Sequence, residues 1–213
     1  SIYSTNNISP INEEDYISPI SNYGQSKASV EKILESLTNE NGSDWSIASL
    51  RYFNPAGAHP SSFLGEGPTL YSRNLFPIIN KVAIGKMDEL KIYGNDWNTS
   101  DGTCIRDYIH VVDVAKGHLK ALEFLQKKKT PFLTLNLGTG KGNSVLEIVN
   151  FFQEENKVKI KYKFEKRRKG DCDILFADNS KALLILNWEP KMTIREMCKD
   201  SWNWQKKITN GFL

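Results

Sequence analysis

The chain has 213 residues, of which 39% are hydrophobic and 25% are charged, and its formal net charge is +3 at pH 7. These values are ordinary for a globular protein with a core of its own. The basic run over 163–169 suggests a solvated face, a nucleic-acid patch or a phosphate site. No apolar run is long enough to span a bilayer, and the first residues lack the pattern of a signal peptide. Cys104, Cys172 and Cys198 show neither metal-ligand spacing nor an even disulfide framework, so we expect a reducing, cytoplasmic setting.

The first quarter of the chain predicts a strand, a helix and a second strand. Residues 1–22 are rich in Ser, Asn and Pro and suggest the end of a strand followed by a long loop. Apolar residues recur at i, i+3, i+4 and i+7 from Val30 to Leu37, which predicts an amphipathic helix over 23–37. A mostly buried strand is expected over 45–53. This strand–helix–strand rhythm is typical of a parallel sheet.

Tyr23 and Lys27 lie four residues apart at the start of this helix, on one face. A phenol beside an ammonium can form an acid–base group, because each charge favours the ionised form of the other. The same spacing is common in helices that carry no chemistry, so the pattern alone leaves both interpretations open. Asn54 follows the second strand, in a loop with two prolines and a glycine. It is a binding candidate, because ligands of doubly wound sheets lie at strand ends.

The remainder of the chain predicts alternating strands and helices. Helices are expected over 74–84, 114–125 and 179–186, and after two capping boxes, Ser144-x-x-Glu147 and Thr193-x-x-Glu196. In the second of these helices, Val114, Ala115, Leu122 and Leu125 are expected to face inward. Shorter strands are expected over 91–93, 106–111, 134–137 and 159–164.

A glycine-rich segment, Gly138-Thr139-Gly140-Lys141-Gly142, lies between a predicted strand and a predicted helix. That context suggests a dinucleotide fingerprint. However, the spacing is G-x-G-x-G with Asn143 in the sixth position, so the glycine that permits close helix–strand packing is missing. We therefore favour a tight turn that precedes the helix capped by Ser144.

Several strings, in order along the chain, resemble the UDP-glucose 4-epimerases, a family of extended short-chain dehydrogenases/reductases. They are YGQSK at 23–27, LRYFNPAGAHP at 50–60, YGND at 93–96, DGTCIRDYIHV at 101–111, NLGTGKGNSV at 136–145, RRKGD at 167–171 and NW at 187–188. The second and fourth strings are quite specific to this family among its relatives.

The resemblance implies an α/β fold class: the carboxyl-terminal part of a doubly wound Rossmann fold that binds NAD, plus a smaller α/β domain that binds a UDP-sugar. Residues 1–58 would belong to the NAD-binding domain. Residues 59–213 would form mainly the UDP-sugar domain and contribute strands and helices back to the first. The family's glycine-rich NAD loop, and the serine or threonine that assists the tyrosine, would precede Ser1. We therefore expect a longer parent protein and an inactive isolated chain.

The implied function is interconversion of UDP-galactose and UDP-glucose by inversion at C4, through a transient 4-keto sugar and with bound NAD. Tyr23 would be the base and acid. Lys27 would hold the nicotinamide ribose and make the phenol more acidic, and Phe53 would be a further cofactor contact. Because the sugar must rotate between the two hydride transfers, firm binding would fall on the UDP half of the substrate.

The resemblance also implies a set of substrate-binding residues. They are Asn54 near the pyrophosphate, Asn74 and Leu75 at a helix start, Lys91, Ile92 and Tyr93 along the uridine, Arg106 at the diphosphate, Arg168 with Asp171 as an Arg-x-x-Asp clamp, and Leu175. Leu175 stands where the bulk of the family's residue controls acceptance of N-acetylated sugars, and leucine leaves that specificity open. From the residues alone, Arg106 beside Asp107 would more often be a structural ion pair, and Arg168 would more often be a solvated charge.

The partners implied are a UDP-hexose and a second copy of the chain, in a homodimer built through a helical bundle that includes the helix over 23–37. Neither nucleic acid nor a membrane is expected as a partner. Two alternatives are another nucleotide-sugar epimerase or decarboxylase of the same fold, and a non-catalytic UDP-sugar-binding fragment. The string RYFNPAGAHP argues against the first of these.

Overall fold

The structure is a computed structural model that describes residues 2–41, 43–67, 74–128 and 130–211. In chain order its elements are α1 (Asn22–Thr38), β1 (Ile47–Tyr52), β2 (Asn54–Ala56), α2 (Leu75–Ala83), β3 (Leu90–Tyr93), β4 (Ile105–Arg106), β5 (Tyr108–His110), α3 (Val111–Lys127), β6 (Phe132–Leu137), β7 (Asn143–Ser144), α4 (Val145–Asn156), β8 (Tyr162–Glu165), β9 (Ile174–Leu175), α5 (Ser180–Leu186) and α6 (Ile194–Thr209). Within the described ranges, no helix has the length and apolar character needed to cross a membrane.

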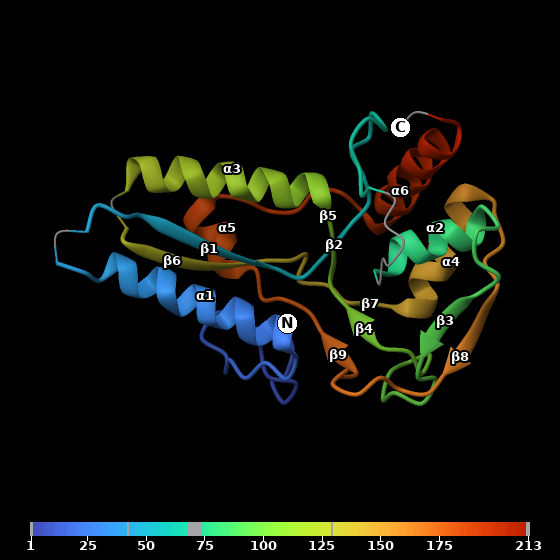
Figure 1. Cartoon of the computed structure of the whole chain (residues 1–213), viewed down its shortest axis with the longest axis horizontal. Helices are drawn as coiled ribbons and strands as arrows, with labels where there is room; N and C mark the ends of the chain where they lie inside the picture. Colours follow the sequence, from blue (N-terminus) through green and yellow to red (C-terminus); the bar gives the residue numbers. More distant parts are fainter. Residues whose placement is uncertain (1, 42, 68–73, 129, 212–213) are drawn as a thin grey trace.

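One lobe is built on the parallel pair β1–β6, with α1 and α3 on opposite sides of it (Figure 1). The register runs from Ile47 opposite Phe132 to Tyr52 opposite Leu137. Its core joins Leu133, Leu135 and Leu137 of β6 to apolar residues of α3, α5 and Trp188. Leu133, Leu135 and Leu137 alternate with Thr134 and Asn136, so the leucines of β6 lie on one face of the strand and pack into this core. The predicted parallel sheet and the α/β class are confirmed.

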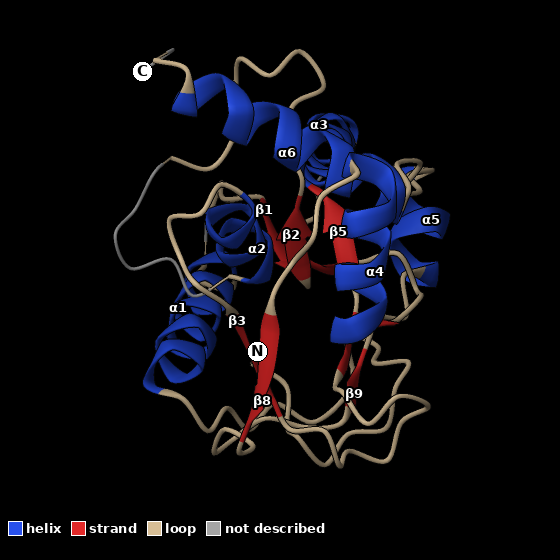
Figure 2. Ribbon diagram, turned by 90° about the vertical axis from the view of Figure 1, so that its right-hand side faces the viewer, coloured by secondary structure: helices blue, strands red, loops and turns tan. Residues whose placement is uncertain are grey.

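The other lobe packs α2, α4 and α6 against short strands (Figure 2). β3 pairs in parallel with β8, and β4 is the middle strand of the order β7-β4-β9. The core of this lobe is formed by buried side chains from three helices and β3, with Phe152 and Ile79 fully covered. The predicted strand over 159–164 is shorter and later than expected, since β8 begins at Tyr162.

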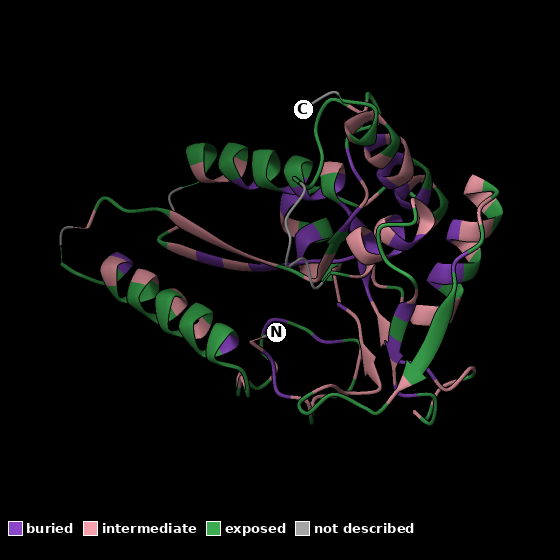
Figure 3. Ribbon diagram, turned by 45° about the vertical axis from the view of Figure 1, so that its right-hand side comes forward, coloured by how far each residue is buried: buried purple, intermediate pink, exposed green. Residues whose placement is uncertain are grey.

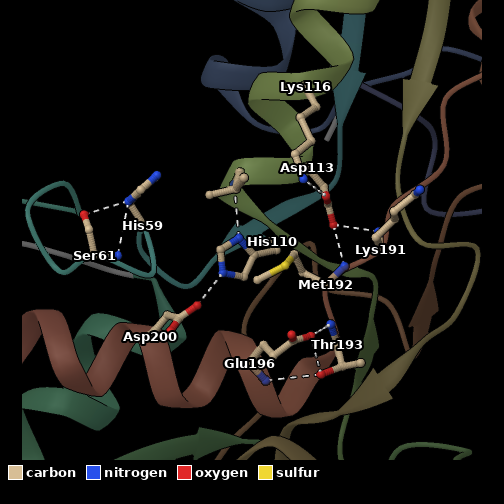
Figure 4. Close-up of polar contacts among 11 residues, drawn as sticks. His59, Ser61, His110, Asp113, Lys116, Lys191, Met192, Thr193, Glu196 and Asp200 are labelled. Atoms are coloured by element: carbon tan, nitrogen blue, oxygen red, sulfur yellow. Dashed lines mark hydrogen bonds and ion pairs between the residues drawn. The ribbon is translucent and has the colours of Figure 1, made fainter.

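The parallel pair β2–β5 lies between the two cores. Asn54 is opposite Tyr108, and Ala56 is opposite His110. Tyr108 belongs to the core of the second lobe and Ile109 to the core of the first, because successive side chains of a strand point to opposite faces. His110 is fully buried, and its Nε2 lies 3.3 Å from Asp200 Oδ2 of α6 (Figure 4). Burial lowers the pKa of His110, although Asp200 opposes this shift.

α3 differs most from its sequence-based prediction. It begins at Val111, three residues early, because His110 Nδ1 caps it by accepting from the Val112 N–H. Its buried face includes Val114, Gly117 and Ala121, whereas Ala115 and Leu122 are exposed. The predicted inward positions of Ala115 and Leu122 are therefore wrong. The reason is Gly117: a Cβ there would lie 2.8 Å from Leu137, so the helix lies against β6 through its small residues.

α1 spans the predicted range, but half of its apolar face is uncovered (Figure 3). Ser21 caps the helix by accepting from the Gly24 N–H at 3.0 Å. Leu34 and Leu37 are partly buried, whereas Val30 is 51% and Ile33 60% exposed. The helix is amphipathic, as the spacing indicates, yet the described chain covers only one side of that face.

Both predicted capping boxes are present, at Ser144 with Glu147 and at Thr193 with Glu196. The Thr193 hydroxyl accepts from the Glu196 N–H, and Glu196 Oε2 accepts from the Thr193 N–H at 2.6 Å. We expect Thr193→Ala to lower the free energy of unfolding by about 1 kcal/mol, because one N–H of α6 loses its acceptor. Chemical denaturation measures this change. Thr193→Ser keeps the hydroxyl and should stay within about 0.5 kcal/mol of the native chain. Equal losses in both variants would contradict the capping role.

Candidate active site

A cavity of about 1410 Å³ is lined by residues from α1, β1, β2, α2, β3, β4 and α6. The lining includes every site residue predicted from the sequence, namely Tyr23, Lys27, Phe53, Asn54, Asn74, Leu75, Lys91, Ile92, Tyr93, Arg106, Arg168, Asp171 and Leu175. These residues come from segments up to about 150 positions apart, and the fold brings them to one surface.

The tyrosine–lysine pair occupies the first turns of α1. Tyr23 is the second residue of the helix and its side chain is 68% exposed. Lys27 Nζ lies 5.4 Å from the centroid of the Tyr23 ring. The helical spacing therefore places the ammonium over the face of the phenol ring, at the wall of the cavity.

A partly buried ionic network fixes α1 against β1. Glu31, one turn beyond Lys27, receives two hydrogen bonds from Arg51, one of them Nε to Oε2 at 3.0 Å. Arg51 also donates to the Tyr3 hydroxyl at 2.8 Å, and that hydroxyl donates to Asn136 of β6 at 2.6 Å. Burial raises the pKa of Tyr3 to about 12. For Arg51, burial lowers the pKa, but the contacts with Glu31 and Tyr3 outweigh it and raise the pKa above its usual value.

Two arginines share one carboxylate at the other end of the cavity. Arg106 Nη2 lies 3.8 Å from Asp171 Oδ1, and Arg168 Nε donates to Asp171 Oδ2 at 3.1 Å. Arg106 also donates to the carbonyl of Cys172 at 2.9 Å. Arg106 does not pair with its neighbour Asp107, so the structural ion pair that the sequence left open is absent from this part of the described chain. The arrangement presents two forks of donors suited to phosphate oxygens.

Aromatic rings flank this cationic end. The Arg168 guanidinium lies 4.4 Å from the centroid of the Tyr93 ring, and Arg167 lies 4.1 Å from that of Trp97. Trp97 donates from its indole N–H to the carbonyl of Tyr93 at 3.1 Å. These contacts hold the end of β3 against the segment that carries the arginines.

The N-terminus of α2 also reaches the cavity. Asn74 is its N-cap residue, but its side chain makes no capping hydrogen bond and lies 3.5 Å from Glu66 Oε1 instead. The first N–H groups of a helix have no partner inside the helix, and they attract anions. Leu75 and Asn74 therefore present backbone donors at the wall of the cavity.

The glycine-rich turn holds a carboxylate from its own chain. The Asp107 side chain accepts from the N–H groups of Thr139 and Gly140, at 2.8 and 3.1 Å, and from the Thr139 hydroxyl at 2.6 Å. Gly138 is needed because a Cβ there would lie 2.5 Å from both Asp107 Oδ2 and Ala177 Cβ. The donors that a dinucleotide phosphate would need are occupied, so the preference for a tight turn is confirmed.

Among the cavity-lining residues that sequence reasoning did not identify are three with ionisable side chains close to the arginines in sequence or contact, namely Cys104, Tyr108 and Cys172. Burial raises the pKa of both thiols and of the Tyr108 phenol, so all three groups are held neutral. The alternation of side chains along a strand could have identified two of these residues from the sequence. Cys104 and Tyr108 lie two positions either side of Arg106, and alternate residues of an extended segment share a face.

A family model described as GDP-mannose 4,6 dehydratase matches residues 1–201. The chain belongs to the GDP-mannose 4,6 dehydratase family. Among proteins similar to this member of the family, UDP-glucose 4-epimerase of Bacillus subtilis is 46% identical over 99% of the chain, and UDP-glucose 4-epimerase 4 of Oryza sativa subsp. japonica is also 46% identical over 99%. The chain spans 62% and 57% of the lengths of these two relatives.

Solved structures agree with the sequence relatives. UDP-glucose 4-epimerase of Stenotrophomonas maltophila, with bound NAD and formylated UDP-arabinopyranose, matches 98% of the chain at a TM-score of 0.95 and 42% identity. The Bifidobacterium longum enzyme, in complex with NAD+ and UDP, matches 99% at a TM-score of 0.92 and 43% identity. Each match covers 62% of the solved chain. The predicted resemblance to UDP-glucose 4-epimerases is confirmed for this family member.

We expect Gly138→Ala to lower the free energy of unfolding by about 1–3 kcal/mol, because the new methyl group would overlap the carboxylate and Ala177. Chemical denaturation measures the loss. Gly67→Ala is the matched control: an added Cβ there meets no atom within 4 Å, so its effect should stay within about 0.5 kcal/mol. A neutral Gly138→Ala would contradict the close packing of this turn.

Proposed function

We propose that the protein interconverts UDP-galactose and UDP-glucose by inverting the configuration at C4 of the hexose. The observation that carries this proposal is one cavity with an exposed Tyr23–Lys27 pair at one end and the Arg106–Asp171–Arg168 cluster at the other. The names of the most similar relatives and the ligands of the solved structures support it.

The cationic end suits the diphosphate of the substrate. Arg106 and Arg168 would bind phosphate oxygens, with the N–H groups at the start of α2 as further donors. Asp171 separates the two guanidinium groups and would accept from the ribose hydroxyls. Lys91 and Tyr93 of β3 would lie along the uridine, and Asn54 on the pyrophosphate side. Firm binding of the UDP half leaves the hexose free to turn.

The size and lining of the cavity fit a second ligand, an NAD. Drug-sized ligands occupy pockets of about 300–1,000 Å³, and the cavity here is larger. The lining of the cavity, which has the Tyr23–Lys27 pair at one end, includes the exposed side chains of Tyr52 and Val111. Tyr23, Lys27 and Phe53 would contact the cofactor at this end. When bound, NAD would supply the hydride acceptor and donor of the reaction.

Side chains of this chain would carry out the proton transfer of the reaction. Tyr23 Oη would remove the proton from the 4-hydroxyl as the C4–H bond breaks, and would return a proton to the 4-oxygen of the keto sugar when the other face is reduced. Lys27, whose Nζ lies 5.4 Å from the centroid of the Tyr23 ring, would hold the nicotinamide ribose. Leu175, at the cavity wall, would contact the hexose. The proton and the hydride are each removed once and returned once, so UDP-galactose and UDP-glucose differ only at C4.

We expect Tyr23→Phe to lower kcat for UDP-galactose conversion by about 10²–10⁴-fold, because the phenyl ring cannot carry a proton. A coupled assay of the protein at its natural length, with added NAD, measures the rate. Tyr16→Phe is the matched control, since Tyr16 is 72% exposed and is not part of the cavity lining. Retained activity in Tyr23→Phe, or bound NAD with no interconversion in the native protein, would reject the proposed function.

We also propose that the protein acts in the cytoplasm as a homodimer that packs through α1. The exposed apolar side chains of Val30 and Ile33 support this contact, and the three thiols, all free, suit a reducing compartment. We expect Ile33→Glu to dissociate the dimer, because a charge would be buried at the interface. Light scattering after size-exclusion chromatography measures the mass. Gln25→Glu adds the same charge to an exposed polar position of α1 and should leave the dimer intact. A monomeric native protein would reject the homodimer.

A further inference from the structure

We propose that Asp107 is a positioning residue for the diphosphate-binding arginines, acting from behind the cavity without touching the substrate. This inference rests on the proposed binding of a uridine diphosphate at the Arg106–Asp171–Arg168 cluster. Asp107 is fully buried and is not part of the cavity lining, although it directly follows Arg106.

The carboxylate of Asp107 connects both neighbours of β4. On one side it accepts from the N–H groups of Thr139 and Gly140, in the turn that leads into β7. On the other side it accepts from the Ala177 N–H at 3.1 Å, two residues after β9. Because β4 is the middle strand of the order β7-β4-β9, one side chain pins both outer strands at the same end of this small sheet.

Apart from the carbonyl of Ile105 at 2.8 Å, the acceptors that orient Arg106 belong to the segment that Asp107 pins. Arg106 donates to the carbonyls of Cys172 at 2.9 Å and Asp173 at 3.5 Å, which lead into β9, and it pairs with Asp171 just before them. A shift of β9 along β4 would therefore move the acceptors of Arg106 and the carboxylate shared with Arg168 together. Two-residue strands such as β4 and β9 have few ladder bonds of their own to resist that shift.

The backbone of Asp107 also hydrogen-bonds to residues that line the cavity. Its carbonyl accepts from the Asn54 N–H at 3.0 Å, and its N–H donates to the Leu175 carbonyl at 3.1 Å. Asn54 and Leu175 both line the cavity, on either side of β4–β5. Asp107 thus contacts the strands that carry three of the proposed substrate-binding residues. Hydrogen-bond donors stabilise the Asp107 carboxylate, and no Lys, Arg or His side chain pairs with it among the described residues.

The alternative role for a buried carboxylate is fold stability alone, and the chain contains a matched case. Asp113 in α3 is also fully buried. It accepts from the N–H groups of Lys191 and Met192 at 2.9 and 2.8 Å and, unlike Asp107, it also pairs with Lys116 at 3.6 Å (Figure 4). Asp113 is not part of the cavity lining. Asp113→Asn therefore removes a similar buried charge from similar N–H donors, but away from the arginines.

The test is calorimetric titration of UDP, and separately of UMP, into the native chain, Asp107→Asn and Asp113→Asn. An asparagine at 107 turns an NH₂ group toward N–H donors, so the strands should lose their fixed register. We expect Asp107→Asn to weaken UDP binding about tenfold or more and UMP binding much less, since the arginines meet the second phosphate. Asp113→Asn should leave both affinities unchanged while lowering the thermal midpoint by a similar amount.

Thr139→Val is the second variant, for use if Asp107→Asn does not fold. It removes the hydroxyl that donates to Asp107 at 2.6 Å and that also accepts from the Lys141 N–H at 3.2 Å, and Thr139 is not part of the cavity lining. We expect it to weaken UDP binding by a few-fold with a smaller effect on UMP. Unchanged selectivity for UDP over UMP in these variants, or an equal loss in Asp113→Asn, would overturn the positioning role. A native chain that binds no UDP would instead reject the proposed substrate, and the inference with it.

Discussion

The parallel pairing of β2 with β5 is the constraint on which the rest of the structure depends. These two short strands run between the cores, and Tyr108 and Ile109 are each buried in a different one. A slip of one residue would exchange the two side chains between cores, so burial fixes the register strongly. The same register sets Asn54 beside the Arg106–Asp107 segment. The geometry of the cavity is thus a consequence of how two hydrophobic cores share one strand pair.

At the cationic end of the cavity, carboxylate and carbonyl acceptors lie beside the two guanidinium groups. These acceptors offset the repulsion between the arginines when no ligand is bound. Asp171 lies between Arg106 and Arg168, and backbone carbonyls accept from some of the other donors of Arg106. Only part of each guanidinium is satisfied in this way, since Arg168 remains half exposed. A phosphate can add to such a cluster without first breaking a fully closed ion pair. Preorganised donors of this kind bind with little loss of side-chain freedom.

Sequence reasoning located the helices and the cavity residues well, for different physical reasons. Capping boxes such as Thr193 with Glu196 are local, so four residues contain the whole interaction. The cavity residues were found through resemblance, which carries three-dimensional information that spacing lacks. The inward face of α3 was predicted wrongly, because the close approach at Gly117 depends on Leu137 and Trp188, which are distant in sequence. The partner of the glycine-rich turn was beyond reach for the same reason, since Asp107 lies 32 residues before Thr139.

The glycine-rich turn has a consequence for protein engineering. Its N–H groups form an anion-binding site, and the Asp107 carboxylate of the same chain already occupies that site. A turn of this kind cannot take part in nucleotide binding while that side chain is present, however closely its glycines imitate a phosphate loop. Shortening the side chain would leave a hole lined by N–H donors, of the size and polarity of a small carboxylate. Formate or acetate from solution could then take the place of the missing group, and the turn would become a chemically addressable site.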